Sequence, residues 1–221
     1  IKSLDDGSGV SPGTVIAEII GDSRAVLTAE RTALNILMRM SGIATATRRL
    51  VEKVRNRGLR VRIAATRKTA PGLRYFDKRA VVLGEGDTHR LRLDDMILIK
   101  DNHIVVAGGI ENAVKKARSA VSFAKKIEVE VKTLEEALKA AQLGVDIIML
   151  DNMTPEEVKR TINALKERNL RDKVLIEISG KITEKNIVEY AELEPEVISL
   201  GGLTHSVKAV DISLEIVKIN P

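Results

Sequence analysis

A chain of 221 residues, 44% of them hydrophobic, can bury one sizeable core, and no stretch approaches the roughly 18 consecutive apolar residues of a membrane helix. The absence of cysteine excludes disulfides, cysteine-ligated zinc and thiol catalysis, and the N-terminal segment lacks the pattern of a signal peptide, so a cytoplasmic location is favoured. The net charge of +5 is compatible with nucleic-acid binding, but with only two tyrosines and two phenylalanines to stack on bases, a cationic active site is the preferred interpretation.

The first part of the chain is predicted to be a fragment of an α+β domain followed by helix. Turn signals at Asp6-Gly7 and Pro12-Gly13 and loose alternation over residues 14–20 indicate short strands. Thr28 is predicted to cap a helix. Ser41-Gly42 is expected to interrupt that helix, and a second helix is expected to continue to about Arg57.

After Gly58 short apolar runs alternate with amphipathic helices. The runs cover residues 61–65, 80–83, 96–99, 127–131, 145–150, 174–178 and 197–200. The helices are predicted at 110–124, 133–143, 154–168 and 183–191, and Thr133…Glu136 and Thr154…Glu157 form capping-box patterns. This alternation indicates a parallel sheet. The predicted fold class is α/β, a seven-stranded incomplete (β/α) barrel plus part of an α+β N-terminal domain. A doubly wound sheet is disfavoured because no glycine-rich nucleotide fingerprint opens a helix.

Polar residues follow five of the predicted strands at their carboxyl ends, where the active sites of barrels are built. They are Lys100, Glu130, Asp151, Ser179-Gly180 and Gly201-Gly202. Glu130 and Asp151 offer the oxygen ligands that suit Mg²⁺, particularly Mg²⁺ that also binds a pyrophosphate. Glu128 lies on the same face of its strand as Glu130, one step deeper, and is interpreted as a structural ion-pair partner.

The stretch from Arg67 to His103 concentrates cationic side chains near strand ends, which predicts anion binding. These side chains are Arg67, Lys68, His89, Arg90 and Lys100. Arginine can grip a carboxylate through two parallel hydrogen bonds, and the glycine-containing loops after the last two strands can bind phosphate through backbone N–H groups. Two anions are therefore expected, a small carboxylic acid and a phosphorylated sugar. His205 is a candidate phosphate or sugar contact, whereas His103 is left out of the site.

Eight stretches together carry a family resemblance. They are ERTALNILMRMSGIATAT (30–47), ATRKTAPGLR (65–74), GDTHRLRL (86–93), LIKDNH (98–103), EVEV (128–131), IMLDNM (148–153), EISGKI (177–182) and ISLGGLTHS (198–206). In this order, across nearly the whole chain, they resemble quinolinate phosphoribosyltransferase, the carboxylating nicotinate-nucleotide pyrophosphorylase family of NAD biosynthesis. The resemblance implies that quinolinate reacts with phosphoribosyl pyrophosphate and Mg²⁺ to give nicotinate mononucleotide, pyrophosphate and CO₂.

The resemblance also implies residue roles. The substrate-binding set is Arg31, Thr66, Arg67, Lys68, His89, Arg90, Lys100, Glu130, Asp151, Ser179, Gly180, Lys181, Gly201, Gly202 and His205. Within it Lys68, Lys100, Glu130 and Asp151 are expected to be catalytic, and Glu130 and Asp151 to hold the metal. Arg31 would reach the site of a neighbouring subunit, which implies at least a homodimer.

The chain departs from the family pattern at two positions. The family usually has glycine at Glu85 and often at Lys181, so an acid at Glu85 could weaken anion binding unless it points away or pairs with an arginine. Residues 1–37 and 207–221 are assigned to a partial N-terminal α+β domain with a returning C-terminal tail, and residues 38–206 to the catalytic barrel.

Two alternatives remain open at this stage. One is a paralogue with the same barrel that acts on another ring acid, such as a molybdenum-transport-associated homologue, although four cations argue for a dicarboxylate. The other is a non-enzymatic protein that uses the basic mouth to bind nucleic acid, which predicts salt-sensitive oligonucleotide binding.

Overall fold

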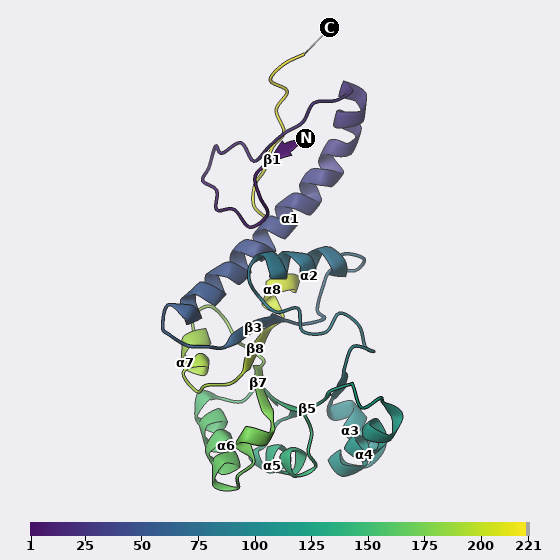
Figure 1. Ribbon diagram of the computed structural model, residues 1–221, viewed down its shortest axis with the longest axis vertical. Helices are drawn as coiled ribbons and strands as arrows, with labels where there is room; N and C mark the ends of the chain where they lie inside the picture. Colours follow the sequence, from purple (N-terminus) through teal and green to yellow (C-terminus); the bar gives the residue numbers. More distant parts are fainter. Residues whose placement is uncertain (220–221) are drawn as a thin grey trace.

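A parallel six-stranded sheet forms the centre of the computed structural model, which describes residues 1–219 (Figure 1). Its strands are β3 (Arg62–Ala65), β4 (Ile97–Ile99), β5 (Ile127–Val131), β6 (Ile147–Asp151), β7 (Leu175–Ser179) and β8 (Val197–Leu200). They pair in the order β3-β8-β7-β6-β5-β4, all parallel. The sheet is open between β3 and β4, so the predicted class, an incomplete (β/α) barrel, is confirmed.

Helices pack on the outer face of this sheet because alternate strand residues there are apolar. Ile148, Leu150, Ile176, Ile178 and Ile198 are all fully buried in the core. The helices are α2 (Arg74–Leu83), α3 (Asp101–Ala107), α4 (Ile110–Ala120), α5 (Leu134–Gln142), α6 (Pro155–Glu167), α7 (Ile187–Ala191) and α8 (Gly202–His205), with a short 3₁₀ turn at Arg171–Lys173. The residues between the apolar ones face inward, which leaves the inner face free for polar side chains.

The expected seventh strand is wrong: residues 80–83 are the last turn of α2. Ala80 and Val81 are buried but Val82 is 45% exposed, which fits one face of a helix, and so short an apolar run does not distinguish helix from strand. The strand-like contact falls a few residues later, where Asp87 forms a parallel bridge with Ala64 of β3. This bridge places the segment that follows α2 beside the open edge of the sheet.

The expected break at Ser41-Gly42 is also wrong, because α1 runs without interruption over Ser23–Arg55. Its N-cap is Asp22, not Thr28, whose hydroxyl bonds within the helix to the carbonyl of Arg24. Gly42 is there for packing: a Cβ at this position would lie 2.2 Å from the carbonyl oxygen of Lys208 in the C-terminal tail. A glycine that allows close backbone approach therefore looks, in the sequence, like a helix end.

Some helix starts were predicted well and some ends were not. The capping box at Thr154 and Glu157 is formed on both sides, and Thr133 accepts the amide of Glu136. The helices predicted to end at 124 and to begin at 183 are shorter, covering Ile110–Ala120 and Ile187–Ala191.

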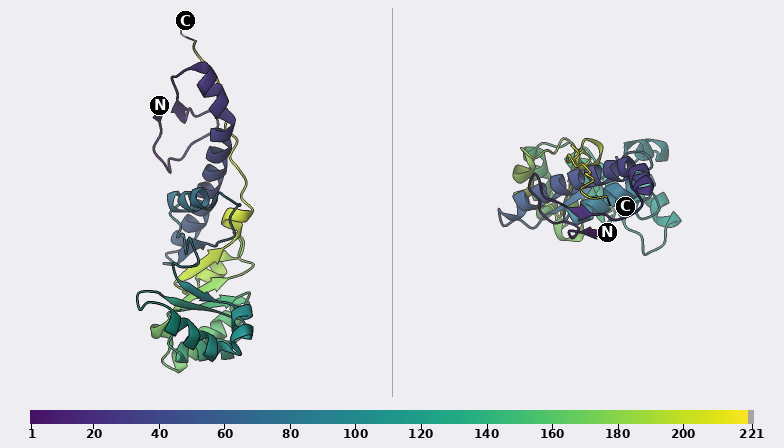
Figure 2. Two further views of the ribbon diagram at one scale, coloured as in Figure 1. Left: turned by 90° about the vertical axis from the view of Figure 1, so that its right-hand side faces the viewer. Right: turned by 90° about the horizontal axis from the view of Figure 1, so that it is seen from above.

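The N-terminal half of α1 projects from the sheet, and the N-terminal segment and the C-terminal tail up to residue 219 lie beside it (Figures 1 and 2). Here β1 (Lys2–Ser3) pairs antiparallel with β2 (Ala17–Glu18), and the tail returns along α1, with the amide of Val210 bonded to the carbonyl of Met38. The domain boundaries given above stay a prediction. Within residues 1–219 no helix combines the length and apolarity needed to cross a membrane.

Candidate active site

The register of the sheet stacks the inward side chains in two layers at its carboxyl edge. Glu130 of β5 pairs in register with Met149 of β6, which pairs with Glu177 of β7. One step further along, Asp151 of β6 pairs with Ser179 of β7. Strand alternation thus places the two predicted carboxylates on adjacent strands and on the same face, with Asp151 nearer the edge.

Two arginines of the predicted cationic set lie close together, and their guanidinium groups have few hydrogen-bond partners in the protein. Arg67 follows β3, and its Nε and Nη1 are buried without a hydrogen-bond partner. Arg90 is 9% exposed and makes one long bond, 3.4 Å from Nη1 to the carbonyl of Met96. Burial, and then the charge of Arg67, lower the pKa of the Arg90 guanidinium. Buried donors without partners are costly, so the unpartnered donors of Arg67 favour the predicted binding of an anion.

The two predicted catalytic lysines have different partners. Lys100 follows β4, and its ammonium bonds to the Glu130 carboxylate, whose side chain is 10% exposed. Lys68 has an exposed side chain, but its backbone is held by the hydroxyls of Thr66 and Thr204. The lysine backbone is therefore fixed while its charged end stays free to meet a ligand.

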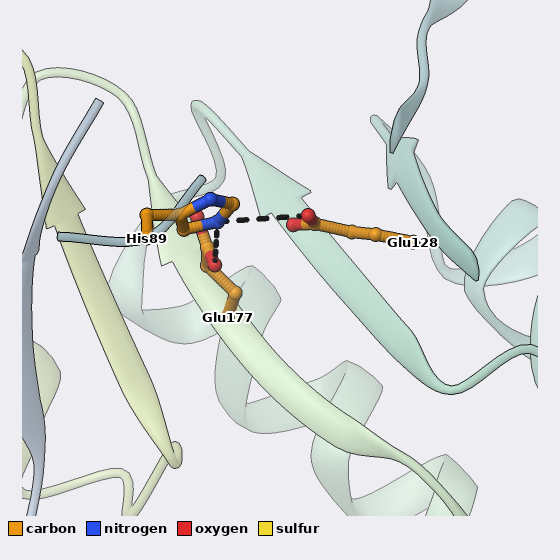
Figure 3. A group of neighbouring side chains, drawn as sticks. All are labelled: His89, Glu128 and Glu177. Carbon is orange, nitrogen blue, oxygen red and sulfur yellow. Dashed lines mark hydrogen bonds and ion pairs between the residues drawn. The ribbon is translucent and has the colours of Figure 1, made fainter. Parts of the chain in front are cut away.

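His89 lies between two buried glutamates, which point toward it from β5 and β7 (Figure 3). Its Nε2 is 2.9 Å from Glu177 Oε2 and 3.6 Å from Glu128 Oε2. Neither oxygen of Glu128 has a hydrogen-bond partner. Glu128 was predicted to be a structural ion-pair partner. In the structure it contacts His89 at 3.6 Å without a hydrogen bond, and His89 is itself a predicted site residue.

The Glu128 carboxyl group is fully buried and resists ionisation. Burial, and then the neighbouring charge of Glu177, raise its pKa well above the usual range. Arg90 and Lys100 act in the opposite direction. Of the two carboxyl groups, Glu177 is the one that hydrogen-bonds to the imidazole.

The loops after β7 and β8, where phosphate binding is predicted, lie beside Asn152 of the loop after β6 and Lys68 of the loop after β3. Gly180 has φ +93°, and a Cβ there would lie 2.5 Å from Asn152 Oδ1, so only glycine fits. Across the loops, a Cβ at Gly201 would lie 3.0 Å from the His205 ring and 3.1 Å from Lys68 Cδ. The structure therefore brings His205, Lys68 and the Gly201-Gly202 turn together.

Glu85, the departure that needed an explanation, points away from this site. Its carboxylate pairs with Arg48 and Arg55 of α1, each at 2.7 Å, and the Arg55 hydrogen bond lowers its pKa. Both departures have left-handed backbones, with φ 63° at Glu85 and 54° at Lys181. This is the conformation that glycine adopts without strain, which accounts for the family preference at both positions.

Two further residues lie outside the cluster. His103 accepts the amide of Lys100 and so caps α3. Arg31 lies on the projecting half of α1 with its side chain 70% exposed, and its nearest acid is Glu30 at 3.8 Å. Within one chain the structure does not bring Arg31 to the other site residues.

Lys78 of α2 is a buried ammonium below the His89 loop. It is 1% exposed and donates to the carbonyls of Thr88 and Ala65. Burial lowers its pKa from 10.5 to about 8.

The Lys78 shift predicts a pH dependence of stability. Because the unfolded state binds this proton more tightly, the free energy of unfolding should rise as pH increases from 8 to 10.5, by at most about 3 kcal/mol. Urea unfolding across this range should show the rise in the natural protein and its loss in Lys78→Met. Parallel pH profiles for the two proteins would contradict the assignment.

Sequence reasoning missed Glu177 and the pair Arg39–Asp77. Glu177 stands two residues before Ser179 in one strand, the same signal that linked Glu128 with Glu130. Asp77 is fully buried, accepts two bonds from Arg39 at 2.7 and 2.8 Å and a third from the amide of Ala70. Periodicity carries no signal for that pair, which joins residues 38 positions apart.

Known proteins resemble this chain over almost its full length. Domain models of quinolinate phosphoribosyl transferase match residues 2–41 (N-terminal domain) and 43–215 (C-terminal domain). A probable carboxylating nicotinate-nucleotide pyrophosphorylase from Archaeoglobus fulgidus is 50% identical over 218 residues, covering 99% of this chain and 83% of that protein. The Homo sapiens carboxylating nicotinate-nucleotide pyrophosphorylase is 42% identical, covering 96% and 71%. The crystal structure of NadC from Streptococcus pyogenes superposes with a TM-score of 0.87 at 42% identity, covering 96% and 72%.

Proposed function

The chain belongs to the quinolinate phosphoribosyltransferase family, and we propose on that premise how its site carries out the family reaction. The enzyme transfers phosphoribosyl from phosphoribosyl pyrophosphate to quinolinate, with release of pyrophosphate and CO₂, and forms nicotinate mononucleotide for NAD biosynthesis. The observation that carries the site assignment is the neighbouring pair Arg67 and Arg90: two buried donor atoms of Arg67 have no protein partner, and Arg90 makes a single long hydrogen bond.

The cationic side chains that follow β3 and β4 and those of the His89 loop bind the dicarboxylate. Arg67 and Arg90 offer planar guanidinium groups to the two carboxylates, with His89, Lys100 and Thr66 completing the contacts. Holding both carboxylates orients the ring so that its nitrogen faces the anomeric carbon of the sugar. Such positioning converts a bimolecular displacement into an effectively unimolecular one.

The turns after β7 and β8 bind the sugar phosphate, and two carboxylates stabilise the positive charge that develops on the ribose. The turns after β7 and β8 offer backbone N–H groups to the phosphate, with Lys181 and His205 beside them. Lys68 lies between these turns and the dicarboxylate side, where it meets the leaving pyrophosphate. As pyrophosphate departs, positive charge grows on the ribose, and the carboxylates of Glu130 and Asp151 stabilise it. The new bond between the ring nitrogen and the anomeric carbon makes the ring a pyridinium, whose positive charge stabilises the electron pair left on the ring carbon when CO₂ leaves. A proton from solvent then takes the place of the lost carboxylate.

The carboxylates Glu130 and Asp151 also fit Mg²⁺. Both lie on adjacent strands and the same face, and their oxygens are the hard ligands that this ion prefers. Bound there together with the pyrophosphate, Mg²⁺ would neutralise charge on the leaving group. In the structure Lys100 donates to one oxygen of Glu130, and Asn152 donates to one oxygen of Asp151.

Release of CO₂ from carboxyl-labelled quinolinate tests the function directly. Labelled CO₂ should appear only when phosphoribosyl pyrophosphate and Mg²⁺ are both present, and nicotinate should be a poor substrate. Faster turnover of nicotinate would support the paralogue instead. Salt-sensitive oligonucleotide binding without CO₂ release would support the nucleic-acid alternative.

We further infer a homodimer in which Arg31 serves the partner's site, and a cytoplasmic enzyme. The support for the shared site is that Arg31 belongs to the N-terminal half of α1, which projects from the sheet (Figure 1), and that its side chain is 70% exposed. Arg31→Ala and Glu130→Ala should each be nearly inactive, yet mixing them under exchange conditions should restore up to about a quarter of the activity, since a random mixture forms hybrids with one intact site. Failure of the mixture to regain activity, with exchange verified, would count against a shared site.

A further inference from the structure

We propose that Glu177 is a positioning residue for His89, which holds the imidazole so that its other ring nitrogen donates a hydrogen bond to a carboxylate of the substrate. This inference rests on the proposed role of His89 in binding quinolinate. Figure 3 shows Glu177 reaching Nε2 from one side of the ring, with the second ring nitrogen on the side away from Glu177.

Burial makes the contact between Glu177 and His89 strong. The Nε2 to Oε2 distance is 2.9 Å, Glu177 is 1% exposed, and the His89 side chain is 11% exposed. A hydrogen bond to a carboxylate is stronger than one between neutral groups, and exclusion of water strengthens it further. The ring therefore has one nitrogen committed to the protein.

The backbone of His89 is also held in place, which keeps the imidazole beside Glu177. Its φ is 54°, a left-handed conformation that a non-glycine residue keeps only when its surroundings enforce it. The enforcing contacts are the Asp87 carboxylate, which accepts the His89 amide at 2.7 Å, and Lys78, which binds the carbonyl of Thr88. Strain at this position aims the side chain at Glu177.

The proton count then explains why a carboxylate is needed behind the ring. A neutral imidazole has one N–H, so a ring that donates to Glu177 would present a lone pair to the substrate carboxylate and repel it. Donation to both carboxylates at once requires an N–H on each nitrogen. The charge of Glu177 compensates the second proton, so a neutral residue there would weaken binding of an acid.

The cluster of His89, Glu128 and Glu177 could alternatively bind a metal ion. One nitrogen of His89 and one oxygen each of Glu128 and Glu177 lie within 4.8 Å of one another, which is compatible with a divalent cation. Yet Arg90 and Lys100 already act electrostatically on Glu128. Glu128 is fully buried, resists ionisation and already faces these two cations, which disfavours a further cation at this cluster.

The test is Glu177→Gln, which keeps the size of the side chain and removes its charge. The KM for quinolinate should rise at least about tenfold, while kcat and the KM for phosphoribosyl pyrophosphate change less than about threefold. Glu177→Asp, which restores the charge with a shorter reach, should recover part of the loss. Glu135→Gln, an exposed glutamate on α5, is the matched control and should behave as the natural enzyme.

Nitrogen-15 NMR of histidine-labelled enzyme reads the ring itself, since the chain has only three histidines. With quinolinate bound, both nitrogens of His89 should carry protons in the natural enzyme and only one in Glu177→Gln. An unchanged KM for quinolinate, or equal rises in KM for both substrates, would overturn the Glu177 role. Loss of the two-proton signal on adding Zn²⁺ to the natural enzyme at stoichiometric concentration would overturn it in favour of a metal site. A natural enzyme that releases no CO₂ would instead reject the proposed function.

Discussion

Glu130→Ala is expected to lower kcat by about 10²–10³-fold while leaving the fold intact. The Glu130 side chain lies at the carboxyl edge of β5 and is 10% exposed. In the proposed mechanism its carboxylate faces the positive charge that develops on the ribose. Lys68→Ala should cause a comparable loss, because its free ammonium is placed to meet the departing pyrophosphate. Pyrophosphate release under saturating substrates measures both effects, and circular dichroism verifies that each variant is folded.

Exposed residues of the same types provide the controls for these two variants. Glu135→Ala on α5 and Lys159→Ala on α6 remove the same charges at exposed helix positions outside the predicted site and should keep the natural kcat. Full turnover by Glu130→Ala or by Lys68→Ala would refute the role assigned to that residue. A loss shared by the control variants would point to net charge and not to the site.

Asp77→Ala is expected to lower the free energy of unfolding by about 3–5 kcal/mol, because it leaves Arg39 without its buried partner. Asp77 is fully buried and holds Arg39 through two bonds, and these bonds raise the pKa of Arg39. Arg39 in turn donates to the carbonyl of Thr204, and Asp77 accepts the amide of Ala70. The network therefore joins α1, the loop that carries Lys68, and α8, so activity should fall together with stability.

An exposed ion pair shows what the same deletion costs without burial. Glu111 and Lys115 of α4 lie 2.8 Å apart on the surface, so Glu111→Ala should cost less than about 0.5 kcal/mol. Urea unfolding of both variants provides the comparison. Near-equal effects would mean that burial does not strengthen the Arg39–Asp77 pair. Restoration of stability in Arg39→Met/Asp77→Leu would show that the cost comes from the unpaired charge.

Much of the site was predictable because it depends on local order along the chain. Each β-strand followed by polar residues identifies one point of the mouth, and parallel pairing brings these points to one edge whatever the details of the helices. Lys100, Glu130, Asp151 and Ser179 were located in this way, and all lie at carboxyl ends of β4 to β7. Strand alternation also put Glu128 on the inner face, as the structure shows.

The tertiary structure decided what local patterns leave ambiguous. A short apolar run indicates that one face of an element is buried, but it does not show whether that element is a helix or a strand. Residues 80–83 were therefore assigned to a strand, whereas they belong to α2. Gly42 could be understood only once the tail was seen against it. The contact of His89 with Glu177 joins positions 88 apart, as no periodic pattern can. The sequence by itself determined which polar residues stand at the carboxyl ends of the strands, because strand order and alternation are local properties. Only the folded chain determined which of them touch, because contacts between distant segments depend on how the sheet closes and on which loop is held against it.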